Sequence, residues 1–160
     1  MHSPNKSNIA VSSLHRYWMW ANRMKEHFDQ SLQDGRLAKT IERVSESGHP
    51  TVMIASFFCD DPGIFMSYWY GGLYVVIEGW QDLSLHDSKI DSLLTDPKVA
   101  MLKRYRNGAF HFQKDYWDDR FRAFVSEKDA AQWVRQLNKE FGRWFLEHSL
   151  NNRGADQAAP

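Results

Sequence analysis

Apolar residues recur at three- and four-residue steps along three long segments, and this spacing restricts the chain to a largely helical fold. Each segment carries one apolar face, which is the pattern of an amphipathic helix packed against a core. The segments run from Ser13 to Asp34-Gly35, from about Phe65 to Leu83, and from Ser126 to about Ser149. In the second segment, adjacent glycines at 71 and 72 predict that another helix packs closely there.

A fourth, locally basic helix is expected after Pro97, because the fixed φ of proline suits a first helical turn. We also expect a shorter helix over residues 36–46, a short turn over 91–95 and an ordered loop over 113–124. The run TVMIASFF, in the segment 51–64, fits a buried strand or a helical turn equally well. The sequence therefore predicts an all-α fold, an antiparallel up-and-down bundle of four main helices with extra short helices and ordered loops.

The length and composition favour a single domain with a substantial core. The chain has 160 residues, of which 42% are hydrophobic and 14% aromatic, and this excludes disorder for most of it. Both ends are polar and rich in small residues. We therefore predict a flexible N-terminal tail over residues 1–12, one domain over 13–150 and a flexible C-terminal tail over 151–160.

Charge and cysteine content exclude several classes of site. Lys plus Arg and Asp plus Glu each number 20, so any contact with a polyanion has to be local. The single cysteine, Cys59, rules out an internal disulfide and a Cys-based zinc site, and we expect it to be buried.

We predict no metal site and no cofactor, because paired carboxylate-x-x-His motifs and a Gly-rich phosphate loop are both missing. Without a signal-like or membrane-spanning run, a cytoplasmic location without membrane contact is expected.

The stretch RNGAFHFQ, at residues 106–113, carries the clearest candidate site. Arginine followed by histidine after four to six residues is common by chance, and it occurs four times here: Arg43 to His49, Arg104 to His111, Arg106 to His111 and Arg143 to His148. The pair Arg106 and His111 differs from the others because Asn107 directly follows the arginine and Phe112 follows the histidine. It also lies on the expected helix after Pro97.

RNGAFH resembles the Arg-polar-x-x-x-His motif of the HEPN superfamily, a group of all-helical domains. The order of helices is also similar, with the motif on the helix before the last and an aromatic, glycine-containing helix before it. The resemblance implies an up-and-down bundle that forms a homodimer. In catalytic members it implies metal-independent RNA cleavage at a site shared across the dimer axis, of a defence or toxin type, with an antitoxin-like protein as a further expected partner.

The residue types of the motif suit RNA cleavage, because RNA carries its own nucleophile in the 2′-hydroxyl. Histidine ionises near neutral pH, so His111 is the candidate for moving protons. Arg106 is the candidate for stabilising charge on the phosphoryl group, and Asn107 for orienting a phosphate oxygen or the histidine. Glu78 lies among apolar residues and needs a partner, so we expect it to pair with Arg104 or Arg106; a solvent-edge Glu78 is the alternative.

Helix geometry constrains how these residues can meet. Five residues of a regular helix turn by about 140°, so Arg106 and His111 would not share a face. Either Gly108 loosens the helix between them, or the two residues act in different subunits.

A second function class remains open, namely a non-catalytic dimeric module that binds a protein or a nucleotide through aromatic side chains. Zero net charge and the acids Asp115, Asp118 and Asp119 favour this alternative, because they would repel RNA phosphates. The same acids could instead anchor Arg120 or Arg122, although a solvated loop is the expectation that the sequence favours. Most Trp and Tyr residues fall at helical spacing and are expected in the core.

Overall fold

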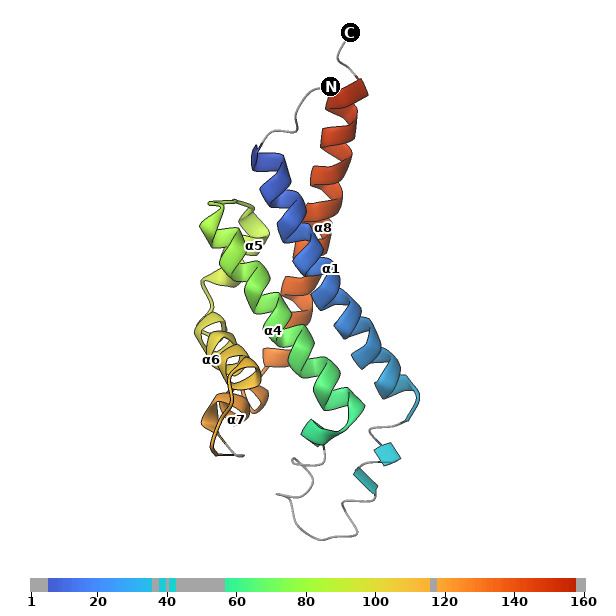
Figure 1. The fold of residues 1–160 in the computed structure, drawn as a ribbon, viewed down its shortest axis with the longest axis vertical. Coiled ribbons are helices and arrows are strands. Elements are labelled where there is room, and N and C mark those ends of the chain that lie inside the picture. The colour runs from blue at the N-terminus through green and yellow to red at the C-terminus, as the bar shows by residue number, and fades with distance from the viewer. Residues whose placement is uncertain (1–5, 36–37, 40, 43–56, 116–117, 158–160) are drawn as a thin grey trace.

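The computed structural model describes residues 6–35, 38–39, 41–42, 57–115 and 118–157. Its helices are α1 (Lys6–Gln33), α4 (Asp61–Asp82), α5 (Ser88–Leu94), α6 (Lys98–Phe110), α7 (Asp119–Val125) and α8 (Ala130–Gln157) (Figure 1). No strand occurs in these residues, so the predicted all-α class is confirmed. Most of the expected helix over residues 36–46 and residues 51–56, which form most of the ambiguous run TVMIASFF, lie outside the described part.

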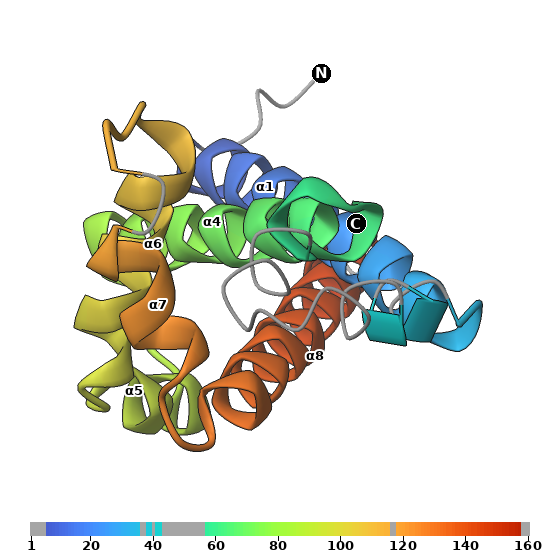
Figure 2. The same ribbon diagram turned by 90° about the horizontal axis from the view of Figure 1, so that it is seen from below.

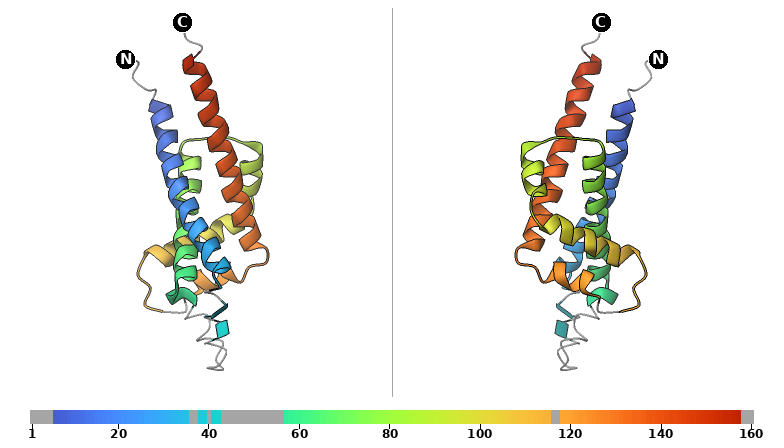
Figure 3. Two further views of the ribbon diagram at one scale, coloured as in Figure 1. Left: turned by 90° about the vertical axis from the view of Figure 1, so that its right-hand side faces the viewer. Right: turned by 90° about the vertical axis from the view of Figure 1, so that its left-hand side faces the viewer.

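The helices pack around α4. Helices α1 and α4 lie side by side and run in opposite directions, while α8 crosses them at an angle (Figures 1 and 2). Helices α6 and α7 pack on each other beside α4, and α5 packs against α8. The start of α1 and the end of α8 lie at the same end of the molecule (Figure 3). None of the helices described combines enough length and apolarity to cross a membrane.

The sequence of α4 explains its central position. Asp60 is extended before the helix and Pro62 lies in its first turn, which suits a residue without a backbone N–H. Trp69 and Trp80 are fully buried on this helix. A Cβ on Gly72 would lie 3.2 Å from the Cβ of Ala21 in α1, so the predicted close approach of a second helix is confirmed.

Both long terminal helices extend beyond the predicted domain limits. Helix α1 begins at Lys6, about two turns before the predicted start near Ser13. Val11 is buried on the same face as Leu14, and its contact with the core stabilises the extra turns. Helix α8 continues to Gln157, past the predicted limit at residue 150. Its only glycine there costs about 1 kcal/mol at most, and no proline interrupts the helix.

Helix α7 replaces part of the loop predicted over residues 113–124. Asp118 starts it, because its carboxylate accepts a hydrogen bond from the backbone N–H of Arg120 at 2.9 Å. Ser126 ends α7 and does not start the final helix as predicted. Asp129 has a positive φ of 59°, which separates the two helices, and α8 begins at Ala130.

Helix α5 covers the predicted turn at residues 91–95 and begins earlier, at Ser88. The Asp87 carboxylate caps it by accepting hydrogen bonds from the N–H groups of Lys89 and Ile90. Arg143 of α8 donates a further hydrogen bond of 2.7 Å to Asp87. Although burial alone would raise it, the pKa of Asp87 is lowered by this partner and by the two backbone donors.

A buried polar residue, Asn138 of α8, links the three longest helices. It is 3% exposed, and its Oδ1 accepts a hydrogen bond from the indole N–H of Trp69 in α4 at 3.2 Å. Its Nδ2 donates to Oδ1 of Asn22 in α1 at 2.8 Å. The indole of Trp18, also in α1, donates to the backbone carbonyl of Asn138 at 3.1 Å. These bonds fix the relative register of α1, α4 and α8.

Candidate functional site

The candidate motif lies at the C-terminal end of α6. Arg106 and Asn107 lie near the end of α6, and His111 is the residue at which the helix ends. His111 has extended backbone angles (φ −123°, ψ 132°), and its N–H donates to the carbonyl of Asn107 at 3.2 Å. The expected angle of about 140° between Arg106 and His111 assumed a regular helix through His111. Because the helix ends at His111, this angle does not describe the direction of the His111 side chain.

Gly108 does not loosen the helix. This finding excludes one of the two ways in which Arg106 and His111 were expected to meet. It is helical and buried, with α7 packed against it. A Cβ at this position would lie 3.2 Å from the Cβ of Arg120 and 3.3 Å from Cζ of Phe121. Gly108 therefore permits close packing of α7 on the motif helix.

Arg106 is held by two polar neighbours. Its Nη1 donates a hydrogen bond of 3.0 Å to Oδ1 of Asn107, and its Nη2 lies 3.6 Å from Oε2 of Glu78 in α4. The side chain of Arg106 is still 28% exposed, so part of the guanidinium can reach a ligand. Glu78 thus pairs with Arg106, one of the two predicted partners. Arg104 is exposed and makes no ion pair within the described ranges.

Tyr74 of α4 lies in the same electrostatic environment and did not stand out in the sequence. It is buried, and this burial raises the pKa of its hydroxyl; Glu78 raises the pKa further, while Arg106 partly offsets both effects. Tyr74 therefore stays protonated at neutral pH. Only its spacing of four residues before Glu78 on α4 indicated that these two side chains would be neighbours.

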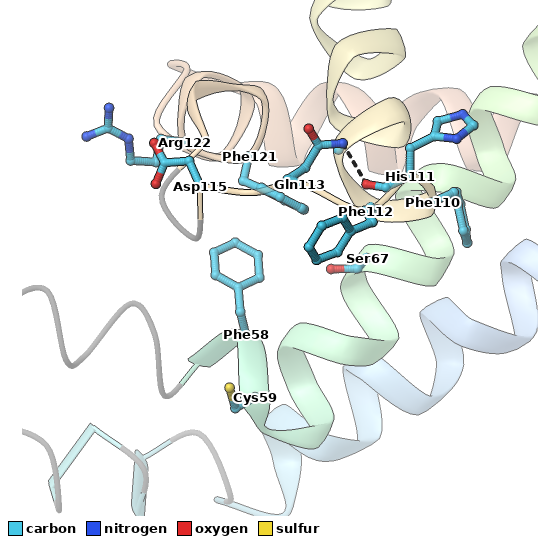
Figure 4. Close-up of a pocket in the computed structure, with 12 residues that line it drawn as sticks. Phe58, Cys59, Ser67, Phe110, His111, Phe112, Gln113, Asp115, Phe121 and Arg122 are labelled. Carbon is cyan, nitrogen blue, oxygen red and sulfur yellow. Dashed lines mark hydrogen bonds between the residues drawn. The ribbon is translucent and has the colours of Figure 1, made fainter.

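The turn that carries His111 is held in place by Gln113. Its Nε2 donates to the carbonyl of His111 at 2.6 Å and to that of Asn107 at 3.3 Å (Figure 4). Arg120 of α7 donates to Oε1 of Gln113 at 2.8 Å, and its Nε lies 3.4 Å from Asp118. Asp118 thus anchors Arg120, the outcome that the sequence favoured less than a solvated loop. Gln113 has no local sequence signature, because its role depends on the packing of α7.

His111 itself is exposed. Figure 4 shows its imidazole directed away from the other labelled side chains around the neighbouring pocket, although its backbone contributes to the pocket wall. Among the described residues, its imidazole has no hydrogen bond or ion pair with Arg106. One chain therefore brings Arg106, Asn107 and Glu78 together, and it leaves His111 and Arg104 outside this group.

The neighbouring pocket has a volume of about 440 Å³ and lies between the start of α4, the end of α6 and α7. Its wall includes the rings of Phe58, Phe112 and Phe121. Cys59 also lines the pocket and is exposed, so the prediction that it is buried is wrong. The residue directly precedes Asp60, where α4 begins, and therefore lies at the edge of the core.

Within the part of the chain that the structure describes, no three His, Cys, Asp or Glu side chains are grouped so that they could hold a metal ion.

Comparisons with protein-family models, with curated proteins and with solved structures found no match for this chain.

Proposed function

We propose that this chain is a HEPN-like helical domain that cleaves RNA as a homodimer without a metal ion. In this proposal α1, α4, α6 and α8 are the four main helices of an up-and-down bundle. The observation that carries the proposal is the state of Arg106, whose guanidinium is oriented by Asn107 and Glu78 and is still partly exposed. An exposed His111 follows at the end of the same helix.

The reaction needs no group from outside the protein and the RNA. A neutral His111 accepts the proton of the 2′-hydroxyl while the 2′-oxygen attacks the adjacent phosphorus. The bond from phosphorus to the 5′-oxygen breaks, and a protonated histidine donates a proton to that leaving oxygen. Arg106 stabilises the additional negative charge on the phosphoryl oxygens. The products are a 2′,3′-cyclic phosphate and a 5′-hydroxyl.

A two-fold dimer supplies the two histidines that the reaction uses, one as the base and one as the acid. It also accounts for the lack of contact between Arg106 and His111 within one chain, because each arginine can act together with the partner's histidine. A closed dimer with two-fold symmetry repeats every site residue, so the composite site needs no further protein.

The test is incubation of the wild-type protein with a range of single-stranded RNAs in EDTA. We expect cleavage with 2′,3′-cyclic phosphate ends, and no cleavage of the same sequences carrying 2′-O-methyl groups, which lack the nucleophile. Products with a 3′-hydroxyl would contradict attack by the 2′-oxygen. If the wild type cleaves none of these RNAs, the proposed activity fails.

The second candidate is the non-catalytic binding module. Three exposed aromatic side chains, Tyr68, Phe110 and Phe112, favour it, since they are 54%, 45% and 91% exposed and Tyr68 packs edge-on against Phe110. Such a surface suits a protein or nucleotide partner. Glu78 also neutralises part of the charge of Arg106, which weakens the attraction of this site for RNA phosphates and so favours the binding module.

The ion pair with Glu78 gives a prediction that separates positioning from stability. Replacing Glu78 with glutamine should lower the RNA cleavage rate about tenfold, because a misplaced catalytic group can cost up to about 100-fold. The free energy of unfolding should change by less than about 1 kcal/mol, since the pair is partly exposed. Cleavage assays and urea unfolding measure the two effects, with Glu127→Gln, an exposed glutamate, as the matched control. Unchanged folding together with unchanged activity would show that Glu78 does not position Arg106.

A further inference from the structure

Three phenylalanine rings converge on the pocket beside His111. Phe58 precedes α4, Phe121 belongs to α7, and their ring centroids lie 5.7 Å apart at a tilt of 58° (Figure 4). Phe112 enters from the segment after α6 and is 91% exposed. A large apolar side chain with this exposure gains little from the fold, so its surface is available to a ligand.

We propose that this pocket binds one nucleobase of a single-stranded RNA whose backbone passes the turn that carries His111. The identification of the ligand as RNA rests on the proposed function. The pocket volume of about 440 Å³ lies in the range of sites for small organic groups. Flat rings in its wall suit a flat base, because every base offers a π-face for stacking.

Chain connectivity places the pocket beside the turn that carries His111. Phe112 directly follows His111, and consecutive Cα atoms lie about 3.8 Å apart. A base stacked on Phe112 therefore has its own sugar and phosphate close to the backbone of His111. Gln113 fixes this geometry, since it hydrogen-bonds the carbonyl of His111 from within the pocket wall.

The charges around the pocket favour a neutral group inside it. Asp115 contributes to the wall, and Arg122 at the rim is paired with Asp119. The described wall is mostly aromatic and its one arginine is already paired, so it suits an uncharged base better than a phosphate. The phosphates of the bound RNA consequently remain outside the pocket, and the base is held by stacking rather than by base-specific hydrogen bonds. We therefore expect little preference among bases.

Cys59 offers a direct probe, because it lines the pocket, is exposed and is the single cysteine of the chain. The experiment measures alkylation of Cys59 by N-ethylmaleimide, using intact mass, in the presence of a short 2′-O-methyl oligoadenylate that cannot be cleaved. An abasic oligonucleotide of the same length is the matched control. We expect the oligoadenylate to slow alkylation and the abasic strand to leave it unchanged. Equal protection by both strands, or none by either, would overturn the base pocket.

A variant pair tests the ring itself. Phe112→Ala should weaken oligoadenylate binding at least about fivefold, measured by fluorescence anisotropy, while Phe112→Trp retains binding. Because Phe112 packs little against the core, the substitution should leave folding intact. The control Trp20→Ala removes another exposed aromatic side chain, 57% exposed on α1, and should bind as the wild type does. Unchanged binding by Phe112→Ala would contradict the proposal.

The outcomes separate this inference from the proposed activity. If the wild type cleaves no RNA but the oligoadenylate protects Cys59 and Phe112→Ala binds weakly, the base pocket stands and the cleavage proposal fails. If cleavage depends on His111 while Cys59 stays unprotected and Phe112→Ala binds normally, the activity stands and the pocket is refuted. If the oligoadenylate does not bind and does not change the rate of Cys59 alkylation, the proposal is overturned.

Discussion

Replacing Arg106 with alanine should lower kcat for RNA cleavage by roughly 100- to 1,000-fold. A pre-oriented donor that stabilises charge in the transition state typically accounts for an effect of this size. Asn107 and Glu78 orient the guanidinium before RNA binds, so its loss removes stabilisation that water does not replace. Arg106→Lys should also lose most of the activity, because an ammonium group lacks the planar, forked donors of arginine. Single-turnover cleavage rates at saturating RNA measure both effects.

The matched control for this prediction is Arg104→Ala. Arg104 lies on the same helix and carries the same charge, but it is exposed and has no ion pair in the described part of the chain. We expect Arg104→Ala to change RNA affinity modestly and in a salt-dependent manner, with kcat nearly unchanged. Equal losses of kcat in the two variants would mean that general basic charge, and not the oriented Arg106, supports cleavage.

Replacing Asn138 with alanine should reduce the free energy of unfolding by about 2–4 kcal/mol. The substitution leaves the indole N–H of Trp69, which is 1% exposed, without its acceptor. An unsatisfied buried donor costs about 1–3 kcal/mol, and the lost bond to Asn22 and the new cavity add to this cost. Urea unfolding followed by tryptophan fluorescence measures the change.

Asn8→Ala is the matched control for the Asn138 prediction, since Asn8 is an exposed asparagine of α1. Its effect should stay within about 0.5 kcal/mol, as is usual for surface substitutions. If Asn138→Ala is as mild as Asn8→Ala, the hydrogen bonds between α1, α4 and α8 contribute nothing to stability, and their assigned role is wrong.

The long helices were predictable because each carries many residues of one apolar face. Gly72 and the tryptophans of α4 belong to such a face, and the structure uses them as the sequence indicated. Helix α7 was missed because its few residues carry no clear period, although the capping residue Asp118 was present as a signal. The ends of α1 and α8 were misplaced because polar composition does not by itself prevent a helix that gains a buried contact such as Val11.

The candidate site was predictable only in part. The pairing of Glu78 followed from its apolar neighbours, since a partly buried carboxylate needs a cation, and the structure supplies Arg106. The direction of His111 could not be predicted from a helical wheel. It depends on hydrogen bonds from Gln113, which is in turn held by Arg120, and these contacts form only when α7 packs on α6. The pocket has the same origin, because the rings of Phe58, Phe112 and Phe121 in its wall come from separate segments.

The most direct test of the central claim compares RNA cleavage by the wild type and by His111→Ala in EDTA. His111 is exposed, so the variant should fold and unfold as the wild type does. The proposed chemistry predicts that the wild type cleaves RNA without a metal ion, and that His111→Ala is slower by about 100- to 10,000-fold, the usual contribution of a proton-transferring residue. Equal rates of cleavage by the two proteins, or cleavage that EDTA abolishes, would contradict it.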